Sequence, residues 1–267
     1  MLIISRVLYH SKGLVLAFIC GWLALINQSA TAALVNWDVL TWAPGSLSNS
    51  YNVDPGNPGN DVTVAVSRDV NRFRNDAATA VMTPAITMSL AGGLSPVQHS
   101  LQMAANLQTQ SRITLTVNFS PQYLKGVANV SFSIFDIDLD TNKDRISGIY
   151  GIALDGSRVA PTITVGPAVT KLGAGVNQVL VGTSASPDTG PGSANGNAMI
   201  SFGSTPITGF TFIWSNSQGS EHYQEIAIGD ISFDVVPEVN PGAAAALLCI
   251  AAAVIQSRRK VKSRSVN

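Results

Sequence analysis

Apolar and polar residues alternate at every second position along several segments in the second half of the chain. This period is typical of β-strands with one buried face, and clusters of Gly, Asn, Asp and Pro separate the segments. The segments that we expect to form strands are 113–119, 127–137, 147–154, 159–165, 178–181, 198–202, 209–214 and 225–235. Many short strands separated by turns predict an all-β fold, an antiparallel β-sandwich or jelly roll.

The first half of the chain shows the alternation less clearly. We expect a helical segment at 67–80 or at 98–107. Two stretches rich in Gly, Pro, Ser and Asn, at 44–60 and 183–197, predict long loops. Neither loop is long enough to separate domains, so we expect one β-sandwich domain over 33–235.

The N-terminus has the three parts of a secretory signal peptide. Arg6 and Lys12 form a basic region, and an apolar region follows at 14–26. The small residues that signal peptidase accommodates are supplied by the sequence Ala-Thr-Ala, which ends at Ala32. We therefore expect a signal helix within residues 1–32, cleavage after Ala32 and export of the remaining chain.

An unbroken apolar run at 243–255 lies close to the C-terminus. A helix of this length reaches ~20–24 Å, which is short of the ~30 Å of a bilayer core. A helix buried in a protein core is disfavoured because the run has no polar face and a basic cluster follows it directly. We expect a short transmembrane helix over 242–256. The basic residues that would stop transfer on the cytoplasmic side include Arg258, Arg259 and Lys260.

Residues 236–264 thus combine a Pro-Glu motif, an apolar helix and a basic cluster in that order. This arrangement resembles the PEP-CTERM sorting signal of bacterial proteins, near whose Pro-Glu-Pro motif a membrane-embedded peptidase, exosortase, is understood to cut. Val239 stands where the commonest form has a second proline, and PEVNP is similar to the P-E-[IV]-N-P variant. The motif residues are Val236, Pro237, Glu238 and Pro241.

The resemblance implies an exported, non-enzymatic protein of the cell surface or extracellular matrix. Its C-terminal helix would hold it in the membrane until an exosortase-type peptidase processes it. Association with exopolysaccharide is also implied. The middle of the chain, with VSFSIFDID and QEIAIGDISFD, resembles the β-sandwich ectodomains that precede such signals. One alternative to this interpretation is a carbohydrate-binding module, and a second, less favoured alternative is a secreted hydrolase.

Charge argues against a nucleic-acid partner. Residues 33–237 carry nine basic and 15 acidic side chains, a formal net charge of −6. A phosphate backbone requires clustered Lys and Arg. We therefore expect no nucleic acid to bind the exported domain.

Carboxylates recur at alternate positions directly after the segment 127–135. The candidate ligands of a structural calcium ion are Asp136, Asp138, Asp140 and Asp144. Like charges on one face repel unless a cation lies among them, and Ca²⁺ prefers carboxylate oxygens. The spacing is not that of an EF-hand, because the turn glycine and the final glutamate are missing. The alternative is a solvated acidic strand end, with Lys143 and Arg145 as neighbouring counter-charges. We expect no other cofactor.

Two further groups of residues suggest chemistry. A histidine lies among carboxylates in the sequence EHYQE at 221–225, which is a conceivable acid–base set or a polar turn before the last strand. Aromatic residues could stack on sugar rings or pack in the core. The aromatic residues considered are Trp37, Trp42, Tyr51, Trp214 and Tyr223.

Overall fold

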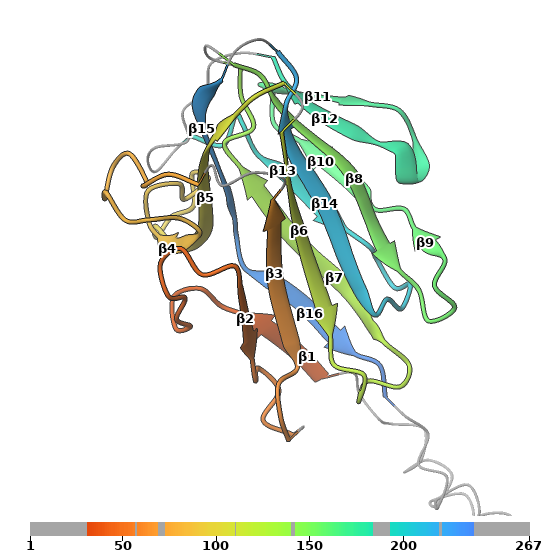
Figure 1. The fold of residues 1–267 in the computed structure, drawn as a ribbon. Helices are drawn as coiled ribbons and strands as arrows, with labels where there is room; N and C mark the ends of the chain where they lie inside the picture. The colour runs from red at the N-terminus through yellow and green to blue at the C-terminus, as the bar shows by residue number, and fades with distance from the viewer. Residues whose placement is uncertain are drawn as a thin grey trace, which may run out of the picture. The chain divides into compact units, whose positions relative to one another are not determined.

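The computed structural model describes residues 31–237, apart from 57, 69–72, 110, 140–141, 184–192 and 219–220. Thr31–Val236 forms one compact unit. Its strands make two antiparallel sheets of eight strands each, which pack face to face (Figure 1). This confirms the predicted antiparallel β-sandwich.

Most of both predicted terminal segments lies outside the described residues. Val236 and Pro237 follow the last strand and are partly exposed. The expected signal helix and transmembrane helix are not among the described elements, and neither are Glu238, Pro241, Arg258, Arg259 and Lys260. Within the described part of the chain, no helix is long and apolar enough to cross a bilayer.

One sheet, named sheet A, has its strands in the order β1, β16, β7, β15, β5, β4, with β13 also on β7 and β10 on β13. Their bounds are β1 Thr31–Val35, β16 Ile231–Val235, β7 Val127–Phe135, β15 His222–Ile228, β5 Ser100–Leu107, β4 Ala85–Thr87, β13 Ala198–Ser201 and β10 Thr162–Val165. The first and last strands, β1 and β16, pair with each other along their whole length.

The second sheet, named sheet B, has the order β11, β12, β8, β14, β6, β3, β2, with β9 also on β8. Their bounds are β11 Val169–Leu172, β12 Val179–Gly182, β8 Asp144–Ile152, β14 Gly209–Asn216, β6 Arg112–Phe119, β3 Val62–Arg68, β2 Ser48–Tyr51 and β9 Arg158–Val159. A short 3₁₀ helix, η1 Gly175–Asn177, lies before β12.

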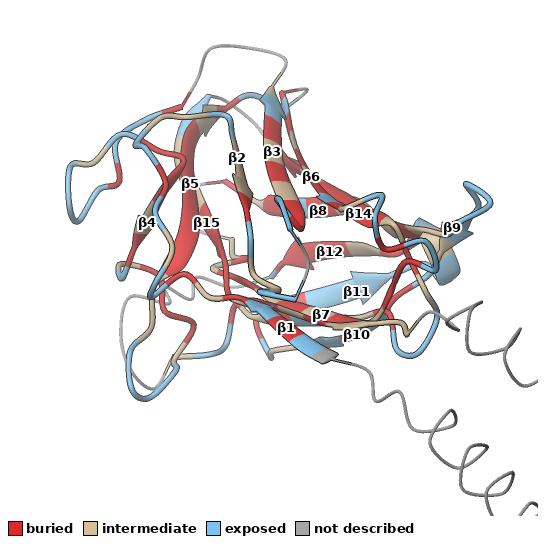
Figure 2. Cartoon of the chain, turned by 90° about the horizontal axis from the view of Figure 1, so that it is seen from below, coloured by how far each residue is buried: buried red, intermediate tan, exposed pale blue. Residues whose placement is uncertain are grey.

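The core lies between the sheets because alternate side chains of each strand point inward. Phe132 of sheet A stacks on Phe210 of sheet B, with ring centroids 4.4 Å apart. Phe119 of sheet B and Phe233 of sheet A also meet between the sheets, in a tilted arrangement with ring centroids 4.8 Å apart. Burying one such side chain stabilises the fold by about 1.5–3 kcal/mol. Figure 2 shows buried positions along the strands and exposed connecting loops.

The prediction of a helix in the first half is wrong at both places. Ser100–Leu107 is strand β5. The other segment begins inside β3, and its residues Phe73 and Asn75 form isolated β-bridges with Ala105 and Met82. The period-2 pattern fails over β5 because almost every residue of this strand is buried, on both faces of the sheet.

Candidate binding groove on the outer face of sheet B

The outer face of sheet B carries a groove of about 680 Å³ over β6, β14 and β8. Ser215 of β14 pairs with Arg112 of β6 on one side and with Arg145 of β8 on the other. These three residues therefore form a row across the sheet. Ile213 and Ser147 form the next row. The remaining described residues of the lining lie beyond the strand ends or at the end of β14: Thr109, Asn216 and Ser217.

A β-bulge in β8 sets which side chains face the groove side. The register of β8 on β14 shifts between the pair Ile213–Ser147 and the pair Thr211–Tyr150. The extra residue is accommodated at Gly148, whose φ of 60° lies in the left-handed region that favours glycine. Since both partners on β14 face outward, Ser147 and Tyr150 also lie on the outer face.

The groove presents hydroxyl and guanidinium groups. Arg112 and Arg145 are both exposed. Within the described part of the chain, neither guanidinium forms a hydrogen bond or an ion pair. Beyond the groove on the same face, the guanidinium of Arg158 lies 4.3 Å from the ring centroid of Tyr150. This contact is a cation–π interaction that fixes the orientation of the tyrosine ring.

Of the two roles that the sequence left open for the aromatic residues, sugar stacking or core packing, the structure shows core packing for four of the five. Trp37, Trp42, Tyr51 and Trp214 are all buried. The indole N–H of Trp37 donates to the carbonyl of Gly229 at 2.9 Å, so this ring is held inside the sandwich. Tyr150 does lie on the open face, and the sequence pattern alone did not single it out because the bulge is needed to turn it outward.

The histidine and carboxylates of 221–225 are not brought together as an acid–base set. Successive side chains of β15 point to opposite faces of the sheet. Hence His222 and Glu225 lie on different faces. Glu225 accepts a hydrogen bond from the backbone N–H of Ala77 at 3.0 Å, and burial raises its pKa. Glu221 instead accepts from the side chain of Gln108 at 3.1 Å.

Asp144, one of the predicted calcium ligands, is fully buried where the two sheets meet. Its Oδ1 accepts from the indole N–H of Trp214 at 2.8 Å and from the amide of Gln224 at 2.9 Å. Burial raises the pKa of Asp144, and the charges of Asp138 and Asp136 raise it further. Its Oδ2 accepts a third hydrogen bond from the backbone N–H of Asp138 at 3.3 Å, so the carboxyl group is already engaged by three N–H donors.

The calcium site stays a prediction. Asp140, one of the four proposed ligands, lies outside the described residues. Among the residues that are described, no group of three or more His, Cys, Asp and Glu side chains is arranged to hold a metal ion. Asp136, which directly follows β7, has a backbone φ of 65° and so leaves the extended strand geometry assumed for the carboxylate row.

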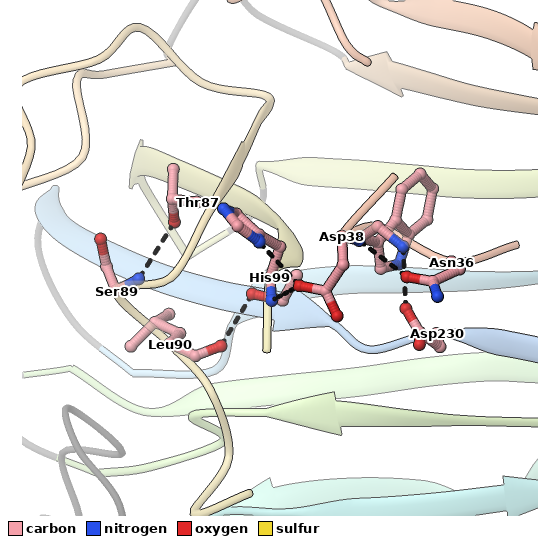
Figure 3. A network of polar contacts seen from close by, with 9 residues as sticks. Asn36, Asp38, Thr87, Ser89, Leu90, His99 and Asp230 are labelled. Atoms are coloured by element: carbon pink, nitrogen blue, oxygen red, sulfur yellow. Dashed lines mark hydrogen bonds and ion pairs between the residues drawn. The ribbon is translucent and has the colours of Figure 1, made fainter. Parts of the chain in front are cut away.

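The outer face of sheet A differs because other parts of the chain lie on it. Figure 3 shows Asp38 accepting hydrogen bonds from His99, at 2.9 Å from the backbone N–H and 2.7 Å from Nδ1. These hydrogen bonds lower the pKa of Asp38. Nearby, Asp230 accepts from the backbone N–H of Trp37 at 2.9 Å, and burial raises its pKa. The network ties three distant segments together.

A smaller hollow of about 260 Å³ does occur on sheet A, beside this network. It is lined in part by Leu34, Leu94 and Met199, which are partly exposed apolar side chains, and by Ser133. Its apolar lining contrasts with the polar lining of the groove on sheet B.

No protein-family model and no curated protein sequence matches the chain. Among solved structures, it is similar to the CBM27-1 carbohydrate-binding module of Caldicellulosiruptor saccharolyticus, solved in complex with mannohexaose. That match has 10% identity and a TM-score of 0.33, and covers 65% of this chain and 90% of that one. The chain is also similar to the family 11 carbohydrate-binding module of the Clostridium thermocellum cellulosomal cellulase Lic26A-Cel5E. That match has 10% identity and a TM-score of 0.30, and covers 79% of this chain and 98% of that one.

A third similar structure is the K1 cleaved adhesin domain of Lys-gingipain from Porphyromonas gingivalis W83. It has 10% identity and a TM-score of 0.32, and the match covers 78% of this chain and 99% of that one. At these identities and TM-scores, the matches assign no family to the chain.

Proposed function

We propose that the domain is a non-enzymatic module that binds a polysaccharide in the groove on sheet B. The observation that carries this proposal is the polar groove itself, built across three adjacent strands whose inner faces are packed in the core. Its volume of about 680 Å³ falls in the ~300–1,000 Å³ range typical of ligand sites.

The lining suits a sugar ligand chemically. Serine hydroxyls donate and accept hydrogen bonds, and so do the hydroxyl groups of a sugar. Arg112 and Arg145 add further donors, while Ile213 offers an apolar contact for a ring face. Arg112, Arg145, Ser147, Ile213 and Ser215 all belong to β-strands. Little ordering of the backbone is therefore needed on binding, and preorganised groups bind with a smaller entropic cost.

We further propose that this domain is exported and sorted by its C-terminal segment. Support comes from the order of the signal peptide, Pro237-Glu238, apolar run and basic cluster along the chain. The intact mass of the native exported protein tests this. We expect residues 1–32 to be absent and the chain to end near Glu238, whereas a mass that includes Arg264 would contradict processing.

Binding is tested by filling the groove. Ser147 is partly exposed on the groove floor, so Ser147→Trp should block a ligand without entering the core. Ser133→Trp places the same side chain in the hollow of sheet A and is the matched control. By affinity electrophoresis in gels containing a panel of polysaccharides, Ser147→Trp should lose retardation and Ser133→Trp should keep it. Equal retardation of both variants and the original protein argues against the groove.

A structural calcium ion at Asp136, Asp138, Asp140 and Asp144 remains a second proposal, supported by the sequence pattern of carboxylates. Calorimetry of the purified protein with calcium and with a chelator tests it. A lower melting temperature in the chelator is expected, and no change would count against calcium.

A further inference from the structure

We propose that the polymer bound in the groove is an anionic polysaccharide, with its carboxylate or sulfate groups held between Arg112 and Arg145. This inference rests on the proposed function and names its ligand class. It follows from where the two arginines lie, from what they lack as partners, and from the hydroxyl groups that continue along the same face.

The two arginines face one another across a small residue. Each lies one strand away from Ser215 in the same cross-strand row. Neighbouring strands are ~4.8 Å apart, so the two backbones are roughly 10 Å apart with only a hydroxymethyl side chain between them. A guanidinium group offers a planar fork of donors that fits a carboxylate or sulfate oxygen pair. An anionic group above Ser215 could thus be reached from both sides.

Neither groove arginine is used inside the protein. Other arginines of the described chain have internal partners: Arg68 stacks on Phe73 at 5.3 Å and Arg158 on Tyr150 at 4.3 Å, and Arg74 faces the side-chain amide of Asn106, whose oxygen accepts from it at 3.0 Å once the amide is turned to satisfy both groups. The groove arginines have no such contact among the described residues, although acidic side chains outnumber basic ones in residues 33–237 by 15 to nine. Two unpaired cations at one groove favour an anionic ligand.

The rest of the face favours a polysaccharide over another polyanion. From the arginine row, outward threonines continue along β6 and β14: Thr114, then Thr116 beside Thr211. A hydroxyl-bearing strip suits a chain of sugars. A nucleic acid instead requires cations at repeated phosphate intervals and exposed rings for base stacking. Here the two unpaired cations lie together at one end of the face, the third arginine of the face is stacked on Tyr150, and the surrounding domain has a formal net charge of −6.

Matched polymers that differ only in charge provide the test. Isothermal titration of the purified protein should show binding to polygalacturonate and much weaker binding to its methyl-esterified, neutral form. Arg112→Gln and Arg145→Gln should each weaken binding about fivefold to tenfold, because each removes charge-assisted hydrogen bonds. Affinity for polygalacturonate should fall as salt is raised. Dextran sulfate and dextran form the second pair. If only this pair shows tighter binding of the charged polymer, and the arginine variants lose that binding, the inference is supported and the bound group is sulfate.

Lys125→Gln is the matched control. It removes the same single charge from an exposed position in the loop after β6, at the far end of that strand from Arg112, and should leave affinity unchanged. An equal loss in Lys125→Gln would mean that net charge alone matters, and would overturn the inference. Melting temperatures of the exposed arginine variants close to that of the original protein confirm that these variants are folded.

The remaining outcomes separate this inference from the proposed function. Equal affinity for charged and neutral polymers, lost in Ser147→Trp and kept in both arginine variants, would overturn the anionic ligand and leave the groove as a sugar site. No binding to any polysaccharide would overturn both. Tighter binding to an oligothymidylate than to either acidic polysaccharide would overturn the choice of polymer.

Discussion

The outer faces of the two sheets differ although their inner faces are built in the same way. On sheet B, outward residues of β6 alternate as exposed or partly exposed threonine, asparagine and arginine. On sheet A, nearly every residue of β5 is buried because the segment 73–99 packs over it. The outer face of sheet B is therefore open over β6, β14 and β8, while that of sheet A is covered over β5 by the chain itself and keeps a small hollow beside β7 (Figures 1 and 2).

The segment 73–99, which we call the cover, is held on sheet A by its own small hydrophobic core and by polar contacts. Leu90 packs on Phe135 and Ala227 from the outer side of the sheet. The backbone also approaches closely, since a Cβ at Gly92 would lie 2.2 Å from the Phe135 ring. The outward Ala227 and Phe135 thus pack against the cover, whereas the outward Arg112, Thr114 and Thr116 stay exposed or partly exposed. The contrast teaches that outward composition decides which face of a sandwich is free to bind.

Removing the core of the cover should give the largest effect. Phe135→Ala leaves a cavity beneath Leu90, and should lower the free energy of unfolding by about 3–5 kcal/mol in urea denaturation. Thr116→Ala on the open face should change it by no more than ~0.5 kcal/mol. Similar values for the two variants would show that the cover adds no stability.

The next effect concerns the polar side of the cover. Burial acts to raise the pKa of Asp76, but hydrogen bonds from Ser89, Thr79 and the Ala78 N–H outweigh it and lower the pKa. A depressed folded-state pKa stabilises the fold above the unfolded value near 4, and this stability is lost as the pH falls through the folded value.

Asp76→Asn should therefore cost about 1–3 kcal/mol at pH 7 and flatten the decline in stability below pH 4, because the ionised group that drives that decline is gone. Melting curves from pH 2 to 7 measure both parts. If the stability of the variant falls with pH below 4 as steeply as that of the original protein, Asp76 is not the source of the decline.

A smaller change is expected on the open face outside the groove. Arg158→Gln removes the cation–π contact with Tyr150, and should lower stability by about 0.5–1 kcal/mol in urea denaturation. Arg158→Lys keeps the charge and serves as the control. If the glutamine variant loses nothing, the stacked arrangement contributes no stability to the face.

Groove arginines should have the smallest effect on stability. Arg112→Gln should change the free energy of unfolding by less than ~0.5 kcal/mol, because the side chain is exposed and has no partner among the described residues. A loss above ~1 kcal/mol in urea denaturation would indicate that this arginine supports the fold rather than serving a ligand.

The fold was predictable where strands have one buried face. The alternation in β6 is strict enough to identify the strand, and β14 is a short apolar and aromatic run that also predicts one. The alternation was also present in β3, with Val62, Val64 and Val66 buried, although our prediction placed a possible helix at its end. For β5 no sequence period could suffice, because the cover buries outward residues such as Gln102 as completely as inward ones.

The groove was not predictable from spacing along the chain. Arg112 and Arg145 lie in one cross-strand row only because β14, far later in the sequence, inserts between β6 and β8. The register that aligns them with Ser215 is a tertiary property. Conversely, tryptophans that looked available for sugar stacking fill the core, since composition does not show on which face a residue lies.

Residue-level NMR tests the central claim of one open binding face most directly. In ¹⁵N-labelled protein titrated with oligogalacturonate, the largest amide shifts should fall on Arg112, Ser147, Ser215 and their neighbours in β6, β8 and β14. The chemical shifts of amides in the cover and around the hollow on sheet A should not change. Shifts confined to sheet A, or none at all, would contradict the account.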